Sequence, residues 1–337
     1  RYLEKMNEYG KHNIPFLFIL DFDLQTPIIL PLQEAKKAGI YFNIKGFSNA
    51  AVNSSLPQHL YFQKYPISFS DYERSFHYVQ QQLRLGNSFL TNLTFPTRIE
   101  TNLSLHQIFD YNQAPYRLLF QDQFTVFSPE SFVQIDDTGK IASFPMKGTI
   151  DARLPNAAEE LLNDRKERAE HNTIVDLIRN DLSRVAKKVR VEKFRYLDHI
   201  QTWDKSLLQM SSKIVGQLPK NYTSHLGYIF EELLPAGSIC GAPKKKTVEV
   251  IKTAEGYERG YYTGVFGYYE NGRVESGVMI RFIENIDGQL YYKSGGGITV
   301  YSEAKKEYQE LIDKVYAPIH REHSSSQREN QEFALAY

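Results

Sequence analysis

The sequence predicts an α+β protein with antiparallel β-sheets. Apolar runs of strand length alternate with helical segments, and most neighbouring strands are joined by short turns. Asn271-Gly272 and Asp287-Gly288 favour two-residue hairpins, and Asp136-Asp137-Thr138-Gly139 predicts a third hairpin turn. Parallel strands need a long crossover connection, so a doubly wound parallel sheet is not expected.

The composition sets limits on class and partners. The 337 residues are 42% hydrophobic and 13% aromatic, which is enough for a large core. Forty basic and forty acidic side chains give a formal net charge of zero, so neither nucleic acid nor an anionic membrane is an expected partner. The single cysteine, Cys240, excludes an intramolecular disulfide and fits a reducing cytosol. No apolar stretch reaches the roughly 20 residues that span a bilayer. We expect a cytoplasmic protein.

The first part of the chain is short and rich in strands. Apolar runs at 16–20, 28–30 and 40–44 predict strands, which makes residues 1–57 a β-rich N-terminal part that ends in a loop. A capping box at Ser70-Asp71-Tyr72-Glu73 predicts the start of a helix, and Gly86 is placed to end it.

The remaining elements alternate in type. Further strands are expected at 89–95, 116–120, 124–128, 132–135, 141–144, 261–269, 274–283 and 289–293. Helices are expected from Asp164, over 222–234 and 243–256, and from Ser302. Periodicity is lost after residue 319, so we predict a single domain over 1–319 and a flexible tail over 320–337.

Lys147 stands out in Pro145-Met146-Lys147-Gly148-Thr149, directly after an alternating apolar run. In a lysine between a Pro-hydrophobe pair and Gly-Thr, we expect the side-chain amine to be accessible to a ligand. An arbitrary lysine in a turn is usually a surface residue, so the assignment of a chemical role depends on other motifs.

Two carboxylate pairs and a glycine run supply those motifs. Glu167 and Glu170, like Glu307 and Glu310, are three residues apart and share one face of an expected helix. Ser294-Gly295-Gly296-Gly297 precedes the last helix, where we expect backbone N–H groups to form an anion-binding nest. Most such pairs are solvated, but together with Lys147 they favour a site for an anionic substrate held through a divalent metal.

These motifs resemble those of the chorismate-utilising enzymes, and Lys147 points to the aminodeoxychorismate synthase component I branch. The resemblance runs from about residue 70 to about 318. It is carried, in order, by Pro145-Met146-Lys147-Gly148-Thr149, Glu167-Arg168-Ala169-Glu170-His171, Asp176-Leu177-Ile178-Arg179-Asn180-Asp181-Leu182, Gly237-Ser238-Ile239-Cys240-Gly241-Ala242-Pro243-Lys244 and Gly295-Gly296-Gly297-Ile298. It implies two stacked antiparallel sheets flanked by helices.

The resemblance also implies a metal and a substrate. Glu170 and Glu310 would bind Mg²⁺ directly and Glu167 and Glu307 through water, and the metal would hold the ring carboxylate of chorismate. The remaining substrate-binding residues would be Thr149, Ser238, Gln209, Tyr262, Arg281, Gly295, Gly296 and Gly297. Tyr262 and Arg281 would hold the enolpyruvyl carboxylate, since a guanidinium fits a carboxylate through two parallel hydrogen bonds. A structural salt bridge of Arg281 is the alternative.

Two residues would carry the chemistry that the resemblance implies. Ser128-Pro129-Glu130 matches a motif whose Glu is the general acid for the departing ring hydroxyl, and that role needs a raised pKa. Lys147 would attack C2 of chorismate, which needs a neutral amine and therefore a depressed pKa. Relatives that form anthranilate typically have Ala at this position. Ammonia would then give 4-amino-4-deoxychorismate.

Several residues depart from the family pattern, and alternatives remain. Leu90 replaces a Gln, or the base Lys of isochorismate-forming relatives, which argues against water addition at C2; the other departures are Ile150, Gln209 and Tyr301. No motif of an ammonia source is visible, so a glutamine amidotransferase partner is expected. The alternative functions are anthranilate synthase component I and a non-catalytic chorismate-binding subunit.

Overall fold

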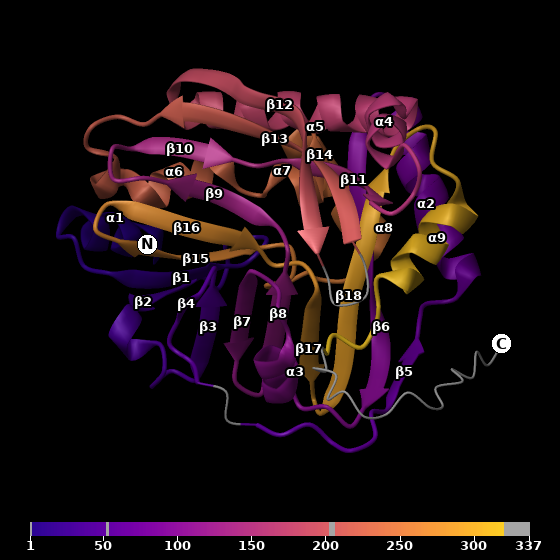
Figure 1. The fold of residues 1–337 in the computed structure, drawn as a ribbon, viewed down its shortest axis with the longest axis horizontal. Coiled ribbons are helices and arrows are strands. Elements are labelled where there is room, and N and C mark those ends of the chain that lie inside the picture. Colours follow the sequence, from indigo (N-terminus) through magenta and orange to yellow (C-terminus); the bar gives the residue numbers. More distant parts are fainter. Residues whose placement is uncertain (1, 52–53, 202–205, 320–337) are drawn as a thin grey trace.

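In the computed structural model, residues 2–51, 54–201 and 206–319 are described, and they form two antiparallel sheets flanked by helices, as predicted. The predicted tail over 320–337 lies outside these residues. The strands of one sheet run across the view in Figure 1, and those of the other run up and down it. Among the described residues, no helix is long and apolar enough to cross a membrane.

Each sheet has nine strands within the described residues, and every recorded pairing is antiparallel. In spatial order, the first sheet contains β11 (Met146–Asp151), β13 (Ser206–Gln217), β10 (Lys140–Ser143), β9 (Ser131–Ile135), β16 (Arg273–Val278), β15 (Val265–Glu270), β1 (Phe16–Leu20) and β2 (Ile28–Pro31), and β12 (Lys187–Gln201) pairs with β13. The second contains β14 (Gly241–Ala242), β6 (Leu90–Thr101), β18 (Gln289–Ile298), β17 (Phe282–Ile286), β8 (Phe124–Ser128), β7 (Tyr116–Phe120), β3 (Ile40–Ile44) and β4 (Phe47–Ser48), and β5 (Phe62–Tyr65) pairs with β6.

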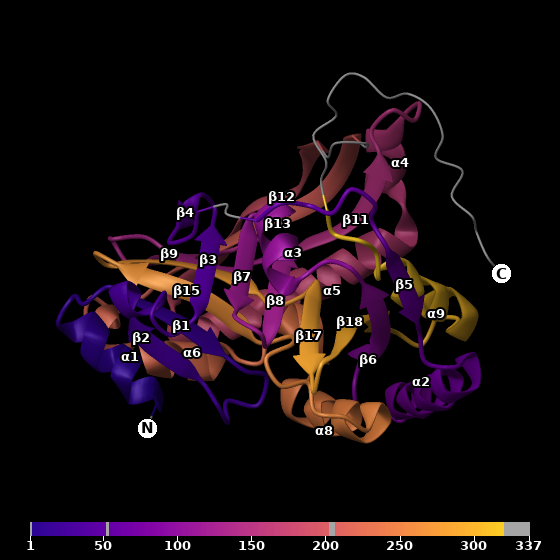
Figure 2. The ribbon, with the colours of Figure 1, turned by 90° about the horizontal axis from the view of Figure 1, so that it is seen from below.

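Helices cover the outer faces of both sheets (Figure 2). They are α1 (Tyr2–Lys11), α2 (Phe69–Arg84), α3 (Leu105–Tyr111), α4 (Ala157–Asn163), α5 (Arg165–Val185), α6 (Leu226–Leu233), α7 (Gly237–Cys240), α8 (Lys244–Glu255) and α9 (Ala304–Asp313), with single 3₁₀ turns at Leu32–Glu34 and Tyr222–His225. The cap of α2 is Ser68, whose side chain accepts from the Asp71 N–H, so the capping box predicted at Ser70 is wrong by two residues. Gly86 follows the helix with a left-handed φ of +75°, as expected.

One core lies between the sheets, where side chains of β1 and β15 meet those of β3, β8 and β17, and a larger one lies between the first sheet and its helices. Alternate residues of β1 point the other way: Leu17 and Ile19 face the second sheet, whereas Phe16, Phe18 and Leu20 pack with α1, α5 and α6. A strand that is buried on both faces is apolar throughout, which is why Phe16–Leu20 shows no polar alternation. The β-rich N-terminal segment therefore contributes strands to both sheets.

Candidate active site

Two chain crossings between the sheets frame a pocket. The crossing from β8 to β9 contains Glu130, and the crossing from β16 to β17 contains Arg281. The Val278 N–H donates to the Glu130 carbonyl and the Phe127 N–H donates to the Arg281 carbonyl, each over 3.0 Å. The crossings are thus joined by backbone hydrogen bonds, and the side chains of Glu130 and Arg281 line the same pocket.

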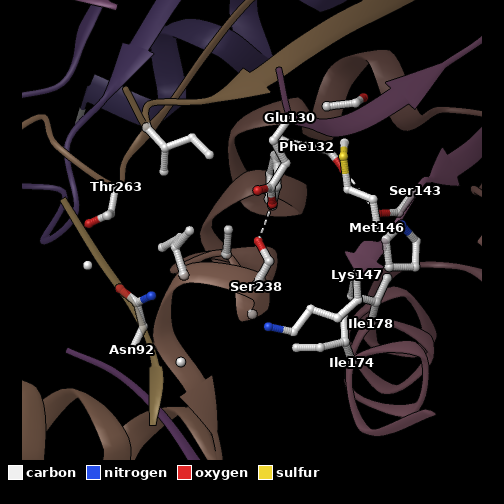
Figure 3. A pocket seen from close by; sticks show the side chains of 18 of the residues that line it. Asn92, Glu130, Phe132, Ser143, Met146, Lys147, Ile174, Ile178, Ser238 and Thr263 are labelled. Atoms are coloured by element: carbon white, nitrogen blue, oxygen red, sulfur yellow. Dashed lines mark hydrogen bonds between the residues drawn. The ribbon is translucent and has the colours of Figure 1, made fainter. Parts of the chain in front are cut away.

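Lys147 reaches this pocket from a β-bulge. The register between β11 and β13 slips by one residue between Met146 and Thr149, and Gly148 within the slip has a left-handed φ of +76°. A bulge of this kind redirects a side chain away from the regular pleat. Figure 3 shows Lys147 and Glu130 pointing into one cavity, with Ser238 beside them.

Carboxylates surround the amine of Lys147. Its Nζ lies 2.8 Å from Glu170 Oε2. Burial by itself would lower the pKa of Lys147, but Glu170, Glu167 and Glu310 together raise it above its ordinary value. In this arrangement the carboxylates outweigh the burial, and the depressed pKa of Lys147 beside a bound cation stays a prediction.

Glu130 has the raised pKa that a proton donor needs. Burial raises the pKa of its carboxyl, and the opposing effects of Ser238, Lys147, Lys314 and Arg281 do not cancel that rise. The Ser238 Oγ–H donates to Glu130 Oε1 over 2.5 Å, which is the dashed line in Figure 3. Glu130 as a whole residue is intermediate in exposure, and it lines the cavity.

The second carboxylate pair lies on α9, beside the glycine run of β18. Glu310 Oε1 is 2.6 Å from Lys314 Nζ. A Cβ atom placed on Gly296 would be 3.3 Å from Glu310 Oε1 and 3.6 Å from Glu307 Oε2. Gly296 thus makes room for both carboxylates at the edge of the pocket.

The four glutamates are chemically suited to Mg²⁺, which prefers oxygen ligands. Glu167 and Glu170 come from α5, and Glu307 and Glu310 come from α9. In the part of the chain that the structure describes, no three acidic, His or Cys side chains gather closely enough to hold a metal ion. The donors stand as two pairs, and one glutamate of each pair bonds a lysine.

The glycines do not form the nest that we expected before the last helix. Gly295, Gly296 and Gly297 lie inside β18, opposite Thr94, Leu93 and Asn92 of β6, and none of the three has a positive φ. The prediction is wrong because these glycines continue a strand. Because these glycines have no side chain, other groups can lie close to the backbone of β18, which is a common reason for glycine within a strand.

Two of these glycines still direct backbone groups toward the pocket. The Thr94 N–H donates to Glu255, and the Gly295 carbonyl accepts from Lys314 Nζ over 2.7 Å. Gly295 and Thr94 are therefore a non-hydrogen-bonded pair, and the backbone groups of Gly295 point away from β6. Because the pattern alternates, Gly297 shares this orientation. β17 pairs with β18 only as far as Lys293, so the N–H groups of Gly295 and Gly297 lie on an open strand edge that lines the pocket.

Tyr262 and Arg281 line the pocket wall. Tyr262 is 4% exposed, and burial raises its pKa. Arg281 precedes β17 with a φ of +54°, and its guanidinium carbon lies 5.7 Å from the centre of the Tyr316 ring. No carboxylate is in ion-pair contact with Arg281 among the residues described, so the structural salt bridge weighed above is not seen.

Some predicted site residues do not line the pocket. They are Glu167, Glu170 and Glu307 of the carboxylate pairs, and Thr149 and Gln209, which face each other across β11 and β13. The sequence interpretation missed Asn92, Lys293 and Lys314, which do line it. Only Lys314 had a signal, because it follows Glu310 by four residues, the spacing of a helical ion pair.

Comparisons with known proteins agree with this architecture. A family model described as chorismate binding enzyme matches residues 35–320. An "uncharacterized PabA-like protein" of Haemophilus influenzae is 51% identical over 94% of this chain and 96% of its own length. Aminodeoxychorismate synthase component 1 of Escherichia coli is 33% identical over 72% of this chain and 56% of its own, so this chain spans little more than half of that relative.

A solved structure shares the fold. The menaquinone-specific isochorismate synthase of Escherichia coli superposes with a TM-score of 0.71 over 93% of this chain and 79% of its own, at 16% identity. Such a low identity speaks for the fold alone. The family model covers most of the sequence and both crossings that frame the pocket. The chain therefore belongs to the chorismate binding enzyme family.

Proposed function

We propose that this chain aminates chorismate at C4 and forms 4-amino-4-deoxychorismate, with ammonia from a glutamine amidotransferase partner. The observation that carries the proposal is the entry of Lys147 and Glu130 into one pocket, a nucleophile and an acid with a raised pKa. The similarity to aminodeoxychorismate synthase component 1 supports the same reaction.

Binding of the substrate uses groups on opposite walls. Arg281 and Tyr262 receive the enolpyruvyl carboxylate, and the open N–H groups of Gly295 and Gly297 receive the ring carboxylate. Glu170 and Glu310 would hold Mg²⁺, assisted by Glu167 and Glu307. When bound, Mg²⁺ supplies positive charge beside the ring carboxylate.

Lys147 acts as the nucleophile. In the arrangement seen here it is an ammonium on Glu170, so Nζ must leave that carboxylate and give one proton to solvent before it attacks. Nζ then bonds to C2, the two conjugated ring double bonds each shift by one bond toward C4, and the C4–O bond breaks. Glu130 gives its proton to the departing hydroxyl, which leaves as water.

The second half of the reaction restores both residues. Ammonia bonds to C4, both double bonds return to their original positions, and the bond between C2 and Nζ breaks, so that Lys147 leaves as a neutral amine and regains its proton from solvent. Glu130, left ionised by the first half, accepts the surplus proton of the new amino group. Thr149 and Gln209 have no step in this scheme, and their role in substrate binding stays a prediction.

Leu90 bears on the alternative of water addition. It lines the pocket, is 7% exposed and has no group that accepts a proton. The position that bears the base Lys in isochorismate-forming relatives is thus apolar here, which disfavours isochorismate formation. Lys147 speaks against anthranilate formation, and a binding subunit without catalysis has no use for Lys147 and Glu130 in one cavity.

The test is product analysis and intact-protein mass spectrometry with chorismate, Mg²⁺ and ammonium. We expect aminodeoxychorismate from the parent, with any trapped adduct at Lys147, and loss of both product and adduct in Lys147→Ala. Lys140→Ala is the matched control, because Lys140 lies on β10 of the same sheet and pairs with Glu192 instead. Anthranilate and pyruvate from the parent, or chorismate binding without turnover, would refute the proposal.

A further inference from the structure

The short helix α7 carries Ser238, the hydrogen-bond donor to Glu130. It has only four residues, Gly237–Cys240. One helical turn is not stable by itself, because nucleation outweighs the few hydrogen bonds that it forms. The position of Ser238 therefore depends on what packs around α7.

A largely buried ion pair lies against the beginning of α7. Asp181 Oδ2 of α5 is 2.8 Å from Lys244 Nζ at the beginning of α8, and both side chains are nearly covered, with 13% and 12% exposed. Lys244 Nζ also donates to the Leu233 carbonyl at the end of α6 over 2.6 Å. A Cβ atom on Gly237 would lie 3.2 Å from Asp181 Oδ2 and even closer to Leu177. Three helices thus meet at the first residue of α7.

The other side of α7 is held by a second ion pair. Arg259 donates to the Ile239 carbonyl over 2.9 Å, and its guanidinium bonds both carboxylate oxygens of the fully buried Glu255. The same guanidinium donates to the Asn92 carbonyl of β6. One side of α7 is thus tied to the second sheet, and the Asp181–Lys244 pair lies against its first residue.

We propose that Asp181 and Lys244 are positioning residues, whose ion pair holds α7 where Ser238 donates to Glu130 and thereby sets the proton-donating geometry of Glu130. The role of Glu130 in this inference rests on the proposed function. A buried ion pair is a weak source of stability, since desolvation offsets much of its attraction. Asp181 lines the pocket and Lys244 does not. The Asp181 carboxylate is bonded to Lys244 at the junction of α5, α6, α7 and α8, so we assign the pair an orienting role.

The charge environment predicts the direction of the effect. Glu130 faces Ser238 from α7, Lys147 from β11, Lys314 from the end of α9 and Arg281 from the second crossing. The Ser238 hydrogen bond lowers the pKa of Glu130. Loss of the Ser238 hydrogen bond therefore raises the pKa of Glu130. The alkaline limb of the pH profile of kcat, where Glu130 deprotonates, then moves to higher pH. Removing the negative charge of Asp181 would by electrostatics alone lower the pKa of Glu130. The direction of the pKa shift therefore distinguishes loss of the Ser238 hydrogen bond from loss of the Asp181 charge.

The experiment compares Asp181→Asn, Ser238→Ala and the double variant across pH, with urea unfolding of each. We expect each single variant to lower kcat by roughly tenfold to a hundredfold, as misplacement of a catalytic group does, and to move the alkaline limb upward. The double variant should match Ser238→Ala alone. Asp176→Asn is the control, because Asp176 is an exposed residue of α5 that pairs with Arg179 and leaves α7 untouched.

An additive double variant, or an Asp181→Asn protein that loses stability without a change of its pH profile, would overturn the inference. Lys244→Arg keeps the charge and should retain the parental profile; it serves as the second variant if Asp181→Asn fails to fold. The Glu130 titration can also be followed without substrate by carbon-13 NMR, assigned with Glu130→Gln. An upward shift of that titration in Asp181→Asn supports the positioning role even if the proposed reaction is absent, and no shift refutes it.

Discussion

Replacement of Gly148 by Ala tests the link between the bulge and the carboxylates. Gly148 has a φ of +76° and follows Lys147 directly. A Cβ atom at this position would lie 2.9 Å from Glu167 Oε2 and 3.0 Å from Leu161 Cδ1. The substitution therefore strains the backbone beside the nucleophile and pushes on a glutamate of the first pair.

The two effects have different sizes and appear in different measurements. A left-handed backbone costs a non-glycine residue about 1 to 2 kcal/mol of unfolding free energy. Glu167 Oε2 must also retreat by about 0.5 Å to reach ordinary contact with the new methyl group. A misplacement of 1 Å in an active site lowers activity by up to about a hundredfold. Half that displacement predicts a loss of about tenfold in kcat.

Gly288→Ala is the matched control. Gly288 has a φ of +87° in the hairpin between β17 and β18, and no atom lies within 4 Å of the position of its Cβ. Both variants should lose similar stability in urea unfolding, but only Gly148→Ala should lose kcat with saturating chorismate, Mg²⁺ and ammonium. Equal activity of the two variants would refute the proposed coupling between the bulge and Glu167.

Two further outcomes follow from the pocket wall and the acid. Arg281→Lys should raise the KM for chorismate about tenfold with little change in kcat, since one charge-assisted hydrogen bond is lost; steady-state kinetics would exclude the carboxylate contact if the KM were unchanged. Glu130→Gln should lower kcat by about 10² to 10⁴ and remove the alkaline limb of its pH profile. The folded pKa of Glu130 is raised, so its stability contribution is complete below its ordinary pKa and is lost as pH rises through the raised one. Urea unfolding across that window should show this loss in the parent only, and the same loss in Glu130→Gln would contradict the assignment.

Local signals in the sequence predicted the hairpins and several helix ends. Asn271-Gly272 and Asp287-Gly288 form the turns that were expected, with positive φ at all four residues. Asp164 caps α5 by accepting from the Glu167 N–H, at the predicted start of that helix. These features depend on a few neighbouring residues, so a sequence pattern contains all the information that they need.

Features that depend on distant partners were missed. No strand was predicted over 187–217, yet β12 and β13 are the longest pair in the first sheet. β12 is polar because it pairs on one side only, and Lys187, Lys193 and Glu192 suit an exposed edge better than a core. The bulge at Lys147 and the orientation of the glycine run likewise arise from pairing with β13 and β6, and no local motif encodes them.

The position of the acid relative to the substrate anchor illustrates why the fold suits this chemistry. Glu130 and Arg281 are 151 positions apart in the sequence, and each lies where the chain passes from one sheet to the other. The hydrogen bonds from Val278 to Glu130 and from Phe127 to Arg281 join the two crossings through the backbone. Their separation is therefore fixed before any side chain moves, as a preorganised site requires. Lys147 is different, because it comes from a bulge and its amine is bonded to Glu170. The acid and the anchor are held by the scaffold, and the nucleophile is the group that must move for the reaction to begin.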